Sequence, residues 1–170
     1  VAPLTVSQVM VNSAEAVDAL LATKSIQLKI DNKPSHHQLM GNETALTGAI
    51  SNLLHNAIEV SSEGDVIEVI TDIVEENGAP FISIQIKDQG CGLSIGQIDN
   101  IFEPFFTTKT QGTGLGLAVV KSVAKSHQGF VSAINNPEGK GACFTLLLPC
   151  IDPKIHFQKY STDLHQGVAI

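Results

Sequence analysis

The sequence contains no arginine: all ten of its basic residues are lysines, and its net charge is −7. A nucleic-acid interface normally needs a basic stripe that displaces counterions from phosphates, and no such stripe is present. We therefore expect no nucleic-acid partner. Because no guanidinium is available for bidentate contacts, any bound phosphate must be held by backbone N–H groups, by lysine or by a metal.

Long apolar runs are also missing. No run reaches the roughly 18 residues that span a bilayer, and the first residues lack the basic and apolar regions of a secretory signal. We expect a cytoplasmic domain without membrane contact, and the absence of an initial methionine suggests a fragment of something longer. The few cysteines have no metal-ligand spacing and are expected to be small buried or half-buried side chains in a reducing compartment, at Cys91, Cys143 and Cys150.

With 170 residues and 43% hydrophobic content, the chain fits one sizeable globular domain. Apolar spacings of three and four predict helices in 11–25, from an Asn42 cap through Val60, and after Gly112, with a short helix near Ile95–Ile101. Gly129 is expected to supply the left-handed stop of the helix after Gly112. Strand patterns follow at 26–30 and in two hairpins, 65–88 and 130–149, the first turning at Asn77-Gly78.

This order of elements predicts a two-layer α/β sandwich, in which about three helices cover one face of a mixed, mostly antiparallel sheet. A doubly wound parallel sheet would need a crossover helix between nearly every pair of strands. We assign residues 1–150 to the domain. Residues 151–170 show no clear period and are expected to form a loosely packed C-terminal tail.

The stretch SNLLHNAIE places Asn52, Asn56 and Glu59 at i, i+4 and i+7, within a narrow sector of one helix face. Two carboxamides and a carboxylate on one line can bind a hard cation such as Mg²⁺, with phosphates completing the shell. The same pattern also fits the solvated face of an amphipathic helix. The spacing alone leaves both interpretations open.

In IQIKDQGCGLS, a strand runs into Asp88, and Gly90 and Gly92 follow. A carboxylate in this position can accept a hydrogen bond from an amino group such as N6 of adenine, while the ligand lies against bare backbone. The alternative is an ordinary turn that contains an aspartate.

The next motif, IFEPFFTTK, gathers Phe102, Phe105 and Phe106 around Pro104. This cluster indicates either a hydrophobic plug under the following segment or a local satellite of the core.

Three glycines, Gly112, Gly114 and Gly116, stand where a helix begins, although glycine costs roughly 1 kcal/mol against alanine inside a helix. N–H groups freed by glycine at a helix N-terminus form an anion site, which the helix dipole strengthens. Lys109 adds a positive charge. The stretch matches neither the P-loop nor the dinucleotide fingerprint, but the same physics predicts that phosphates lie on this backbone, with hydroxyls from Thr107, Thr108 and Thr113.

The four motifs occur in one order, and together they resemble the ATP-binding catalytic domain of bacterial sensor histidine kinases. NLLHNA resembles the family's N box, DQGCGLS its G1 box, IFEPFFTTK its F box and GTGLGL its G2 box, over roughly residues 12–149. The resemblance implies the Bergerat-type sandwich of the GHKL superfamily, which is shared with gyrase B, Hsp90 and MutL. The short lid resembles most the nitrogen-regulation subfamily, which includes flagellar and other sensors that act on σ54-dependent regulators.

The resemblance also implies roles for individual residues. Asn56 corresponds to the Mg²⁺ ligand, and Asn52 lies one turn earlier, near metal and phosphates. Asp88 corresponds to the acceptor of adenine N6, beside Gly90 and Gly92. Residues 103–113 correspond to the ATP lid. The groups that should hold the triphosphate are Lys109, Gly112, Thr113, Gly114, Leu115 and Gly116, and those implied in phosphoryl transfer are Asn52, Asn56 and Lys109.

Hydrolytic members of the superfamily carry a glutamate that activates water at the position of Asn52, and a neutral amide cannot act as that base. The resemblance therefore implies transfer of the γ-phosphate to a histidine rather than to water. None of the six histidines lies in an H box, so the acceptor should lie on a separate upstream dimerisation domain. His127, at a helix end, is expected to be structural.

The predicted function is thus binding of Mg-ATP by a domain that is monomeric in isolation and donates phosphate for relay to a response regulator, with a σ54-dependent activator as the candidate. Glu59 stands where many kinases carry lysine or arginine, which predicts modest nucleotide affinity. Two alternatives remain: a nucleotide-binding regulatory or anti-sigma-like module, and an ATPase of the gyrase–Hsp90 type.

Overall fold

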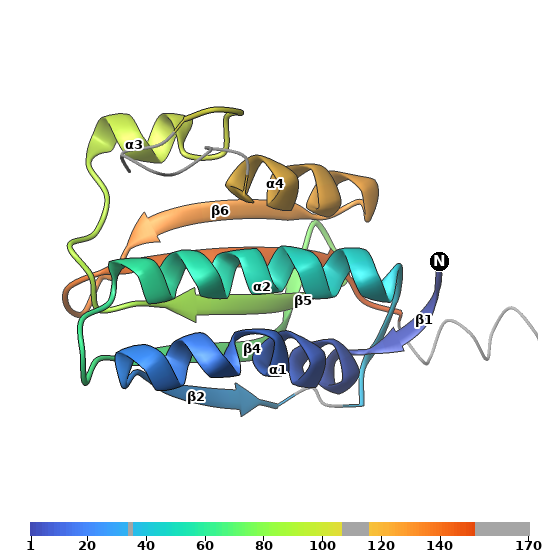
Figure 1. The fold of residues 1–170 in the computed structure, drawn as a ribbon. Helices are drawn as coiled ribbons and strands as arrows, with labels where there is room; N and C mark the ends of the chain where they lie inside the picture. Colours follow the sequence, from blue (N-terminus) through green and yellow to red (C-terminus); the bar gives the residue numbers. More distant parts are fainter. Residues whose placement is uncertain (34–35, 107–115, 152–170) are drawn as a thin grey trace, which may run out of the picture.

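The structure is a computed structural model that describes residues 1–33, 36–106 and 116–151. Its elements run through the chain as Figure 1 shows, with helices and strands interleaved. In order they are β1 (Ala2–Thr5), α1 (Val6–Lys24), β2 (Gln27–Asn32), β3 (Gln38–Gly41), α2 (Glu43–Val60), β4 (Val66–Glu76), β5 (Ala79–Lys87), α3 (Ile95–Asn100), α4 (Gly116–Ser126), β6 (Phe130–Asn135) and β7 (Ala142–Pro149).

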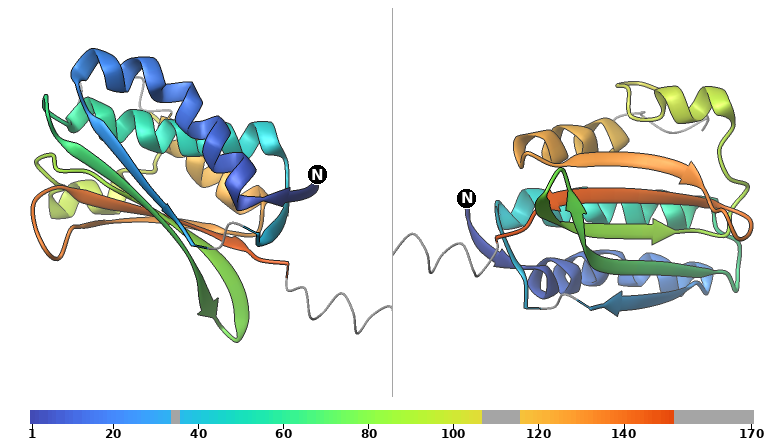
Figure 2. Two further views of the ribbon diagram at one scale, coloured as in Figure 1. Left: turned by 90° about the horizontal axis from the view of Figure 1, so that it is seen from below. Right: turned by 180° about the vertical axis from the view of Figure 1, so that it is seen from behind.

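Five strands form one sheet in the order β2-β4-β5-β7-β6. Only β2 and β4 run parallel, and the other three pairs are antiparallel. Helices α1, α2 and α4 lie on one face of this sheet, and no described element covers the other face (Figure 2). The predicted mixed two-layer sandwich is confirmed. The parallel pair is possible because the connection from β2 to β4 is long and contains α2, whereas β4–β5 and β6–β7 are antiparallel hairpins.

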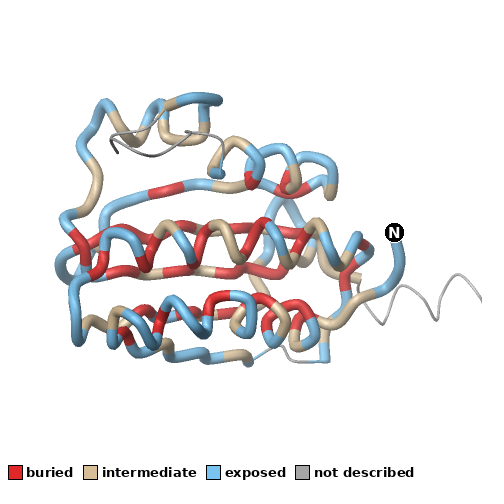
Figure 3. The backbone as a smooth tube through the Cα atoms, in the orientation of Figure 1, coloured by how far each residue is buried: buried red, intermediate tan, exposed pale blue. Residues whose placement is uncertain are grey.

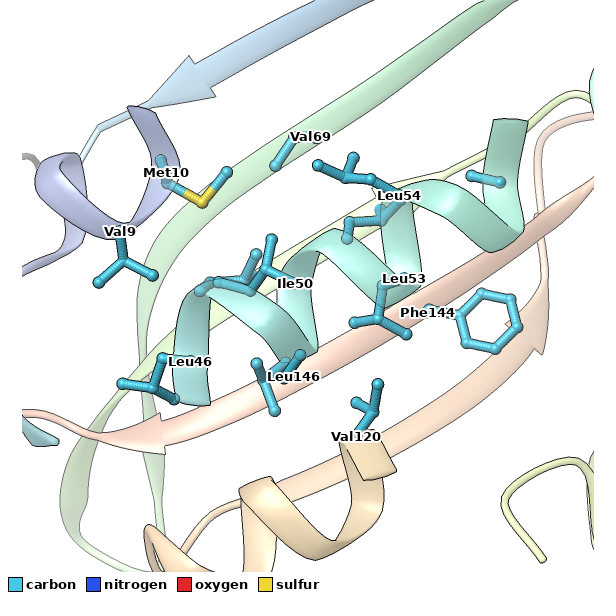
Figure 4. Close-up of a cluster of buried hydrophobic side chains, with 14 of the residues drawn as sticks. Val9, Met10, Leu46, Ile50, Leu53, Leu54, Val69, Val120, Phe144 and Leu146 are labelled. Carbon is cyan, nitrogen blue, oxygen red and sulfur yellow. The ribbon is translucent and has the colours of Figure 1, made fainter. Parts of the chain in front are cut away.

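The core lies between the sheet and α2, the central helix (Figure 3). Leu46, Ile50 and Leu53 on α2 are completely buried. Figure 4 shows α1 contributing Val9 and Met10, α4 contributing Val120, and β7 contributing Phe144 and Leu146 to the same cluster. Burial of one such side chain stabilises the fold by roughly 1.5–3 kcal/mol. The apolar face of α2 is therefore held on the sheet, and its polar face is left for the site.

Two short strands were not expected from the sequence. β1 and β3 form an antiparallel two-stranded sheet in which Ala2 lies opposite Gly41 and Thr5 opposite Gln38. Each has four residues, which is too short for alternation to be distinguished from a loop. The first helix is also longer than predicted: it begins at Val6, and the Thr5 side chain caps it by accepting a hydrogen bond from Gln8 N.

The end of α4 differs from the expectation as well. The left-handed residue is Gln128, with φ of 58°, and Gly129 does not have a positive φ. Gly129 is needed for another reason, because a Cβ at this position would overlap the carbonyl oxygen of Leu147 on β7. The glycine therefore allows β6 to start in close contact with its neighbouring strand.

At the other terminus, the last described residue, Ile151, donates from its backbone N to the Gln38 carbonyl at 2.7 Å. It forms an isolated antiparallel bridge with β3. The predicted boundary at residue 150 thus falls next to this contact, and the predicted tail lies outside the described residues from position 152 onward. Among the helices of the described ranges, none combines the length and hydropathy needed to cross a bilayer.

Candidate nucleotide-binding site

The first part of the site is the polar face of α2. Asn42 caps this helix as predicted, with its Oδ1 accepting from Ala45 N at 2.9 Å. Asn52 and Asn56 are both half-buried, one turn apart. The Nδ2 of Asn52 donates to the carbonyl of Gly116, the first residue of α4, at 3.4 Å. The fold therefore brings the predicted metal-binding face beside the start of the helix that follows the predicted phosphate loop.

The second part is Asp88, which directly follows β5 and is only 2% exposed. Its Oδ1 accepts hydrogen bonds from Gly90 N at 2.9 Å and from Ala142 N at 3.1 Å. Neither bond uses Oδ2. Burial raises the pKa of Asp88 above 3.8, with a smaller contribution from the negative charge of Asp65, and the two backbone bonds oppose this rise only partly.

The two glycines after Asp88 are required by the packing of the loop against the protein itself. A Cβ on Gly90 would lie 2.9 Å from both Cγ2 and the carbonyl oxygen of Val60, at the end of α2. Gly92 has φ of 77°, and a Cβ there would lie 2.8 Å from Oδ1 of Asn135. The loop is thus pressed between α2 and the end of β6, and glycine is the residue that permits both approaches.

The turn between β6 and β7 packs against Asp88 and bonds to it. This contact was not predicted, because the sequence indicated only a hairpin there. A Cβ on Gly141, which has φ of 92°, would overlap the carbonyl oxygen of Asp88. Asn136 and Ala142 both bond to Asp88. In the sequence, the signal for this contact between the turn and Asp88 is an asparagine pair followed by closely spaced glycines, as in NNPEGKG.

A family model described as "Histidine kinase-, DNA gyrase B-, and HSP90-like ATPase" matches residues 41–151, which include every part of the site described above. The chain belongs to this ATPase family.

Curated proteins similar to the chain include named kinases. The chain is 37% identical over 138 residues to the sensor histidine kinase ZraS of Escherichia coli strain K12, a match that covers 81% of this chain and 29% of ZraS. It is 31% identical over 144 residues to sporulation kinase E of Bacillus subtilis strain 168, covering 85% of this chain and 19% of that kinase. The chain therefore spans less than a third of the length of these relatives.

Solved structures show the same fold. The mycobacterial sensor histidine kinase MprB matches with a TM-score of 0.74 and 26% identity, over 87% of this chain and 96% of that one. The catalytic domain of the histidine kinase ThkA matches with a TM-score of 0.75 and 21% identity, over 86% and 95%. Full-length ShkA, solved in complex with AMPPNP, matches with a TM-score of 0.74 and 23% identity, over 88% of this chain and 31% of ShkA.

Part of the ATPase-family motif set falls on residues that the structure does not describe. Of the predicted phosphate-binding groups, only Gly116 is described. Residues 107–113 of the predicted lid lie outside the described residues. So do the other predicted phosphate-binding groups: Lys109, Gly112, Thr113, Gly114 and Leu115, and the hydroxyls of Thr107 and Thr108.

The F box of this ATPase-family chain divides into a buried and an exposed part. The ring of Phe102 meets Phe144 of the core edge to face, with centroids 6.1 Å apart. Phe106 is half-buried, whereas Phe105 is 75% exposed. Of the two interpretations of this cluster, Phe102 fits a satellite of the core, and the exposed Phe105 is not part of that satellite.

The cysteines and His127 were also assigned from sequence. Cys143 is buried, which raises the pKa of its thiol, and Cys150 is half-buried, but Cys91 in the loop after Asp88 is exposed, contrary to the expectation. His127 has the expected structural role. Its Nε2 accepts from Asn42 N at 3.0 Å, and its Nδ1 lies 2.7 Å from the Val123 carbonyl, so it joins the end of α4 to the start of α2.

Outside the parts described above, the described residues form no metal-binding cluster but do enclose a cavity. The described residues include no cluster of three or more His, Cys, Asp or Glu side chains that could hold a metal. A cavity of about 400 Å³ lies at the opposite end of the sheet from Asp88, where β7 ends beside His127 and Met40. It includes none of the predicted site residues.

Proposed function

We propose that the chain is the catalytic domain of a sensor histidine kinase, which binds Mg-ATP and donates the γ-phosphate to a histidine on a separate upstream dimerisation domain. The observation that carries the proposal is the buried Asp88 carboxylate. It stands at the end of a central strand with both of its backbone bonds on one oxygen. The kinase names of the two curated relatives, one of them a sensor histidine kinase, and the AMPPNP in the ShkA structure support the same conclusion.

In this proposal, Asp88 recognises the base. Because Gly90 N and Ala142 N both donate to Oδ1, Oδ2 is the oxygen positioned to accept from the 6-amino group of adenine. An acceptor that is already held by the backbone loses little freedom on binding, which favours affinity. Burial of the carboxylate also strengthens the hydrogen bond, because water competes less for it.

Asn56 would hold Mg²⁺, and Asn52, one turn earlier, would lie near the metal and the phosphates. Their half-buried amides lie on the α2 face beside the start of α4, and amide oxygens are ligands that a hard cation accepts. The bound cation would neutralise charge on the phosphates. We propose on the sequence pattern that Lys109 and the backbone from Gly112 through Thr113, Gly114 and Leu115 to Gly116 hold the triphosphate. Because the Asn52 side chain is a neutral amide, it does not activate water for hydrolysis.

We also propose the rest of the protein, its location and its partner from the sequence motifs and the curated relatives. The curated relatives are three or more times longer than the matched part, which leaves room for a phosphoacceptor domain in the whole protein. We place the domain in the cytoplasm, as a monomer in isolation, with no nucleic-acid or membrane contact. A response regulator would receive the phosphate. The nitrogen-regulation subfamily, with a σ54-dependent activator as that regulator, rests on the form of the lid motif alone.

Titration calorimetry with Mg²⁺ and a non-hydrolysable ATP analogue tests the site. The unmodified chain is expected to bind, and Asp88→Asn and Asn56→Ala are expected to lose most of the affinity. In Asp88→Asn the amide oxygen would keep the two backbone bonds, so its NH₂ would face the 6-amino group and donor would oppose donor. Asp72→Asn, at an exposed aspartate on β4, is the matched control. Equal binding by all four proteins would refute the adenine assignment, and an unmodified chain without binding would refute the function.

A second experiment separates the kinase from the two alternatives. With γ-labelled ATP, the isolated chain is expected neither to hydrolyse nucleotide steadily nor to label itself, and to label an added phosphoacceptor domain from its own protein. Steady hydrolysis without transfer would instead indicate a gyrase-type ATPase. Binding without either reaction would indicate a regulatory module.

A further inference from the structure

The loop after Asp88 receives most of its hydrogen bonds from a distant part of the chain. Within residues 88–93, the described local bonds are those from Gly90 N to Asp88 Oδ1 and from the Cys91 thiol to the Gly92 carbonyl. The backbone of Asp88, by contrast, donates to the carbonyl of Ala142 at 3.0 Å, and Ala142 N returns a bond to its carboxylate. Residue 88 is therefore joined to the start of β7 by a reciprocal pair.

Asn136 adds the next connection. Its Nδ2 donates to the Asp88 carbonyl at 2.8 Å and to the Lys140 carbonyl at 2.9 Å. Its backbone N donates to the carbonyl of Gly141 at 3.0 Å. One side chain thus closes the β6–β7 turn and, with the same amide group, fixes the backbone of the residue that carries the adenine acceptor.

Asn135 fixes the other end of the loop. Its Oδ1 accepts from Leu93 N at 2.7 Å, and its Nδ2 donates to the Leu93 carbonyl at 2.8 Å. This reciprocal pair imitates the hydrogen bonds of a neighbouring strand. It also occupies the space beside Gly92, where a Cβ would lie 2.8 Å from Oδ1 of Asn135.

We infer that Asn135 and Asn136 are positioning residues of the adenine site, which hold the two ends of loop 88–93 so that the Asp88 carboxylate faces the 6-amino group of a bound purine. The inference rests on the proposed function and extends it from the residue that contacts the base to the turn that orients it. Neither asparagine needs to touch the nucleotide.

The readout that distinguishes positioning from general stability is the choice between purines. Inosine triphosphate lacks the 6-amino group, so an oriented Asp88 should favour an ATP analogue over its inosine counterpart. Asn136→Ala removes both Nδ2 bonds and lets residue 88 shift. We expect about tenfold weaker binding of the ATP analogue, because the carboxylate is then no longer held in line with the 6-amino group. The affinity for the inosine analogue should change little. A loss of folded protein would weaken both ligands equally.

Asn135→Ala provides the second variant, because its exposed side chain can be removed without emptying the core. It should accelerate hydrogen exchange of the Leu93 amide in the nucleotide-free chain and weaken the ATP analogue by a few-fold. Asn100→Ala is the matched control, as its exposed amide makes one bond within α3, to the Gly96 carbonyl at 3.0 Å. It should change neither exchange at Leu93 nor purine preference.

The outcomes are separable. An unchanged preference for the ATP analogue in Asn136→Ala, together with unchanged exchange at Leu93 in Asn135→Ala, would overturn the inference while leaving the proposed function intact. An unmodified chain that binds neither purine would overturn both. If Asn136→Ala does not fold, hydrogen exchange of the Leu93 amide and the affinity for the ATP analogue in Asn135→Ala decide whether the inference holds.

Discussion

Two consecutive segments of the chain, 88–93 and 94–100, are stabilised by different kinds of contact. The second is held by its own residues: Ser94 Oγ accepts from Gln97 N at 3.3 Å, and Gln97 Oε1 accepts from Ser94 N at 2.7 Å. This capping box starts α3. The first segment is held mainly by distant residues: Val66, 23 positions from its partner Gln89, and the β6–β7 turn, more than forty positions away. A site loop that depends on distant contacts forms only when the whole sheet is assembled, whereas a short capped helix depends on its neighbours.

The largest effect is expected where the distant contact leaves no room for a side chain. Gly141→Ala would force a Cβ into the Asp88 carbonyl at a positive φ, and we expect a loss of about 3 kcal/mol of unfolding free energy. For a chain of this size, that lowers Tm by roughly 6–12 °C. Nucleotide affinity should fall with it. Gly139→Ala, which has nothing within 4 Å of the added Cβ, is the control for thermal unfolding; equal Tm values for the two variants would contradict the packing argument.

The next largest loss of unfolding free energy is expected when Lys24, which bonds to the end of α2 where Gly90 packs, is replaced. Lys24 on α1 donates from Nζ to the carbonyls of Ile58, Glu59 and Ser61, at 2.9, 3.3 and 3.0 Å. A cation at a helix C-terminus also interacts favourably with the helix dipole. Lys24→Met keeps most of the side-chain bulk and should cost about 1.5 kcal/mol in urea unfolding.

Lys121→Met serves as the comparison for Lys24. Its ion pair with Glu103 at 3.0 Å joins two side chains that are more than half exposed, so its loss should cost less than about 0.5 kcal/mol. If both lysine variants lose the same free energy of unfolding, the three carbonyl bonds of Lys24 stabilise the fold no more than an exposed ion pair does.

A smaller, pH-dependent change in the free energy of unfolding is expected from Asp88. Because its pKa is higher in the folded than in the unfolded chain, ionisation destabilises the fold as pH rises from 3.8 through the raised pKa. That cost is fully present above the raised pKa and absent below 3.8. Asp88→Asn removes the charge and should be the more stable protein at neutral pH, with the difference shrinking on acidification. Urea unfolding across pH measures this, and a variant less stable than the unmodified chain at neutral pH would contradict it.

The smallest effect is expected in the locally held segment. Ser94→Ala removes one half of the capping box, but α3 has only six residues and buries none of them. Its loss should change global unfolding by less than about 0.5 kcal/mol, below the usual cost of removing a cap from a buried helix. Nucleotide affinity should remain the same. An effect as large as that of Gly141→Ala would show that the two segments are stabilised in the same way.

Local patterns predicted the parts of the molecule that local physics controls. Asn42 starts α2 and the apolar spacing extends it to Val60, as predicted, and the Asn77-Gly78 turn joins β4 to β5. Asp88 was found because a strand followed by two glycines is visible in a few residues. The strands β1 and β3 and the role of Gly129 were not found, since each is defined by a partner far along the chain.

The sequence by itself determined which face of α2 is apolar, where the hairpins turn and which carboxylate follows β5, because each of these depends on residues a few positions apart. Only the tertiary structure decided that Asn136 and Gly141 lie against Asp88 and that Asn135 bonds to Leu93 at the other end of the loop. Their contacts exist because β5 and β7 pair in one register, with Lys87 opposite Cys143, and that register sets the end of one strand against the start of the other.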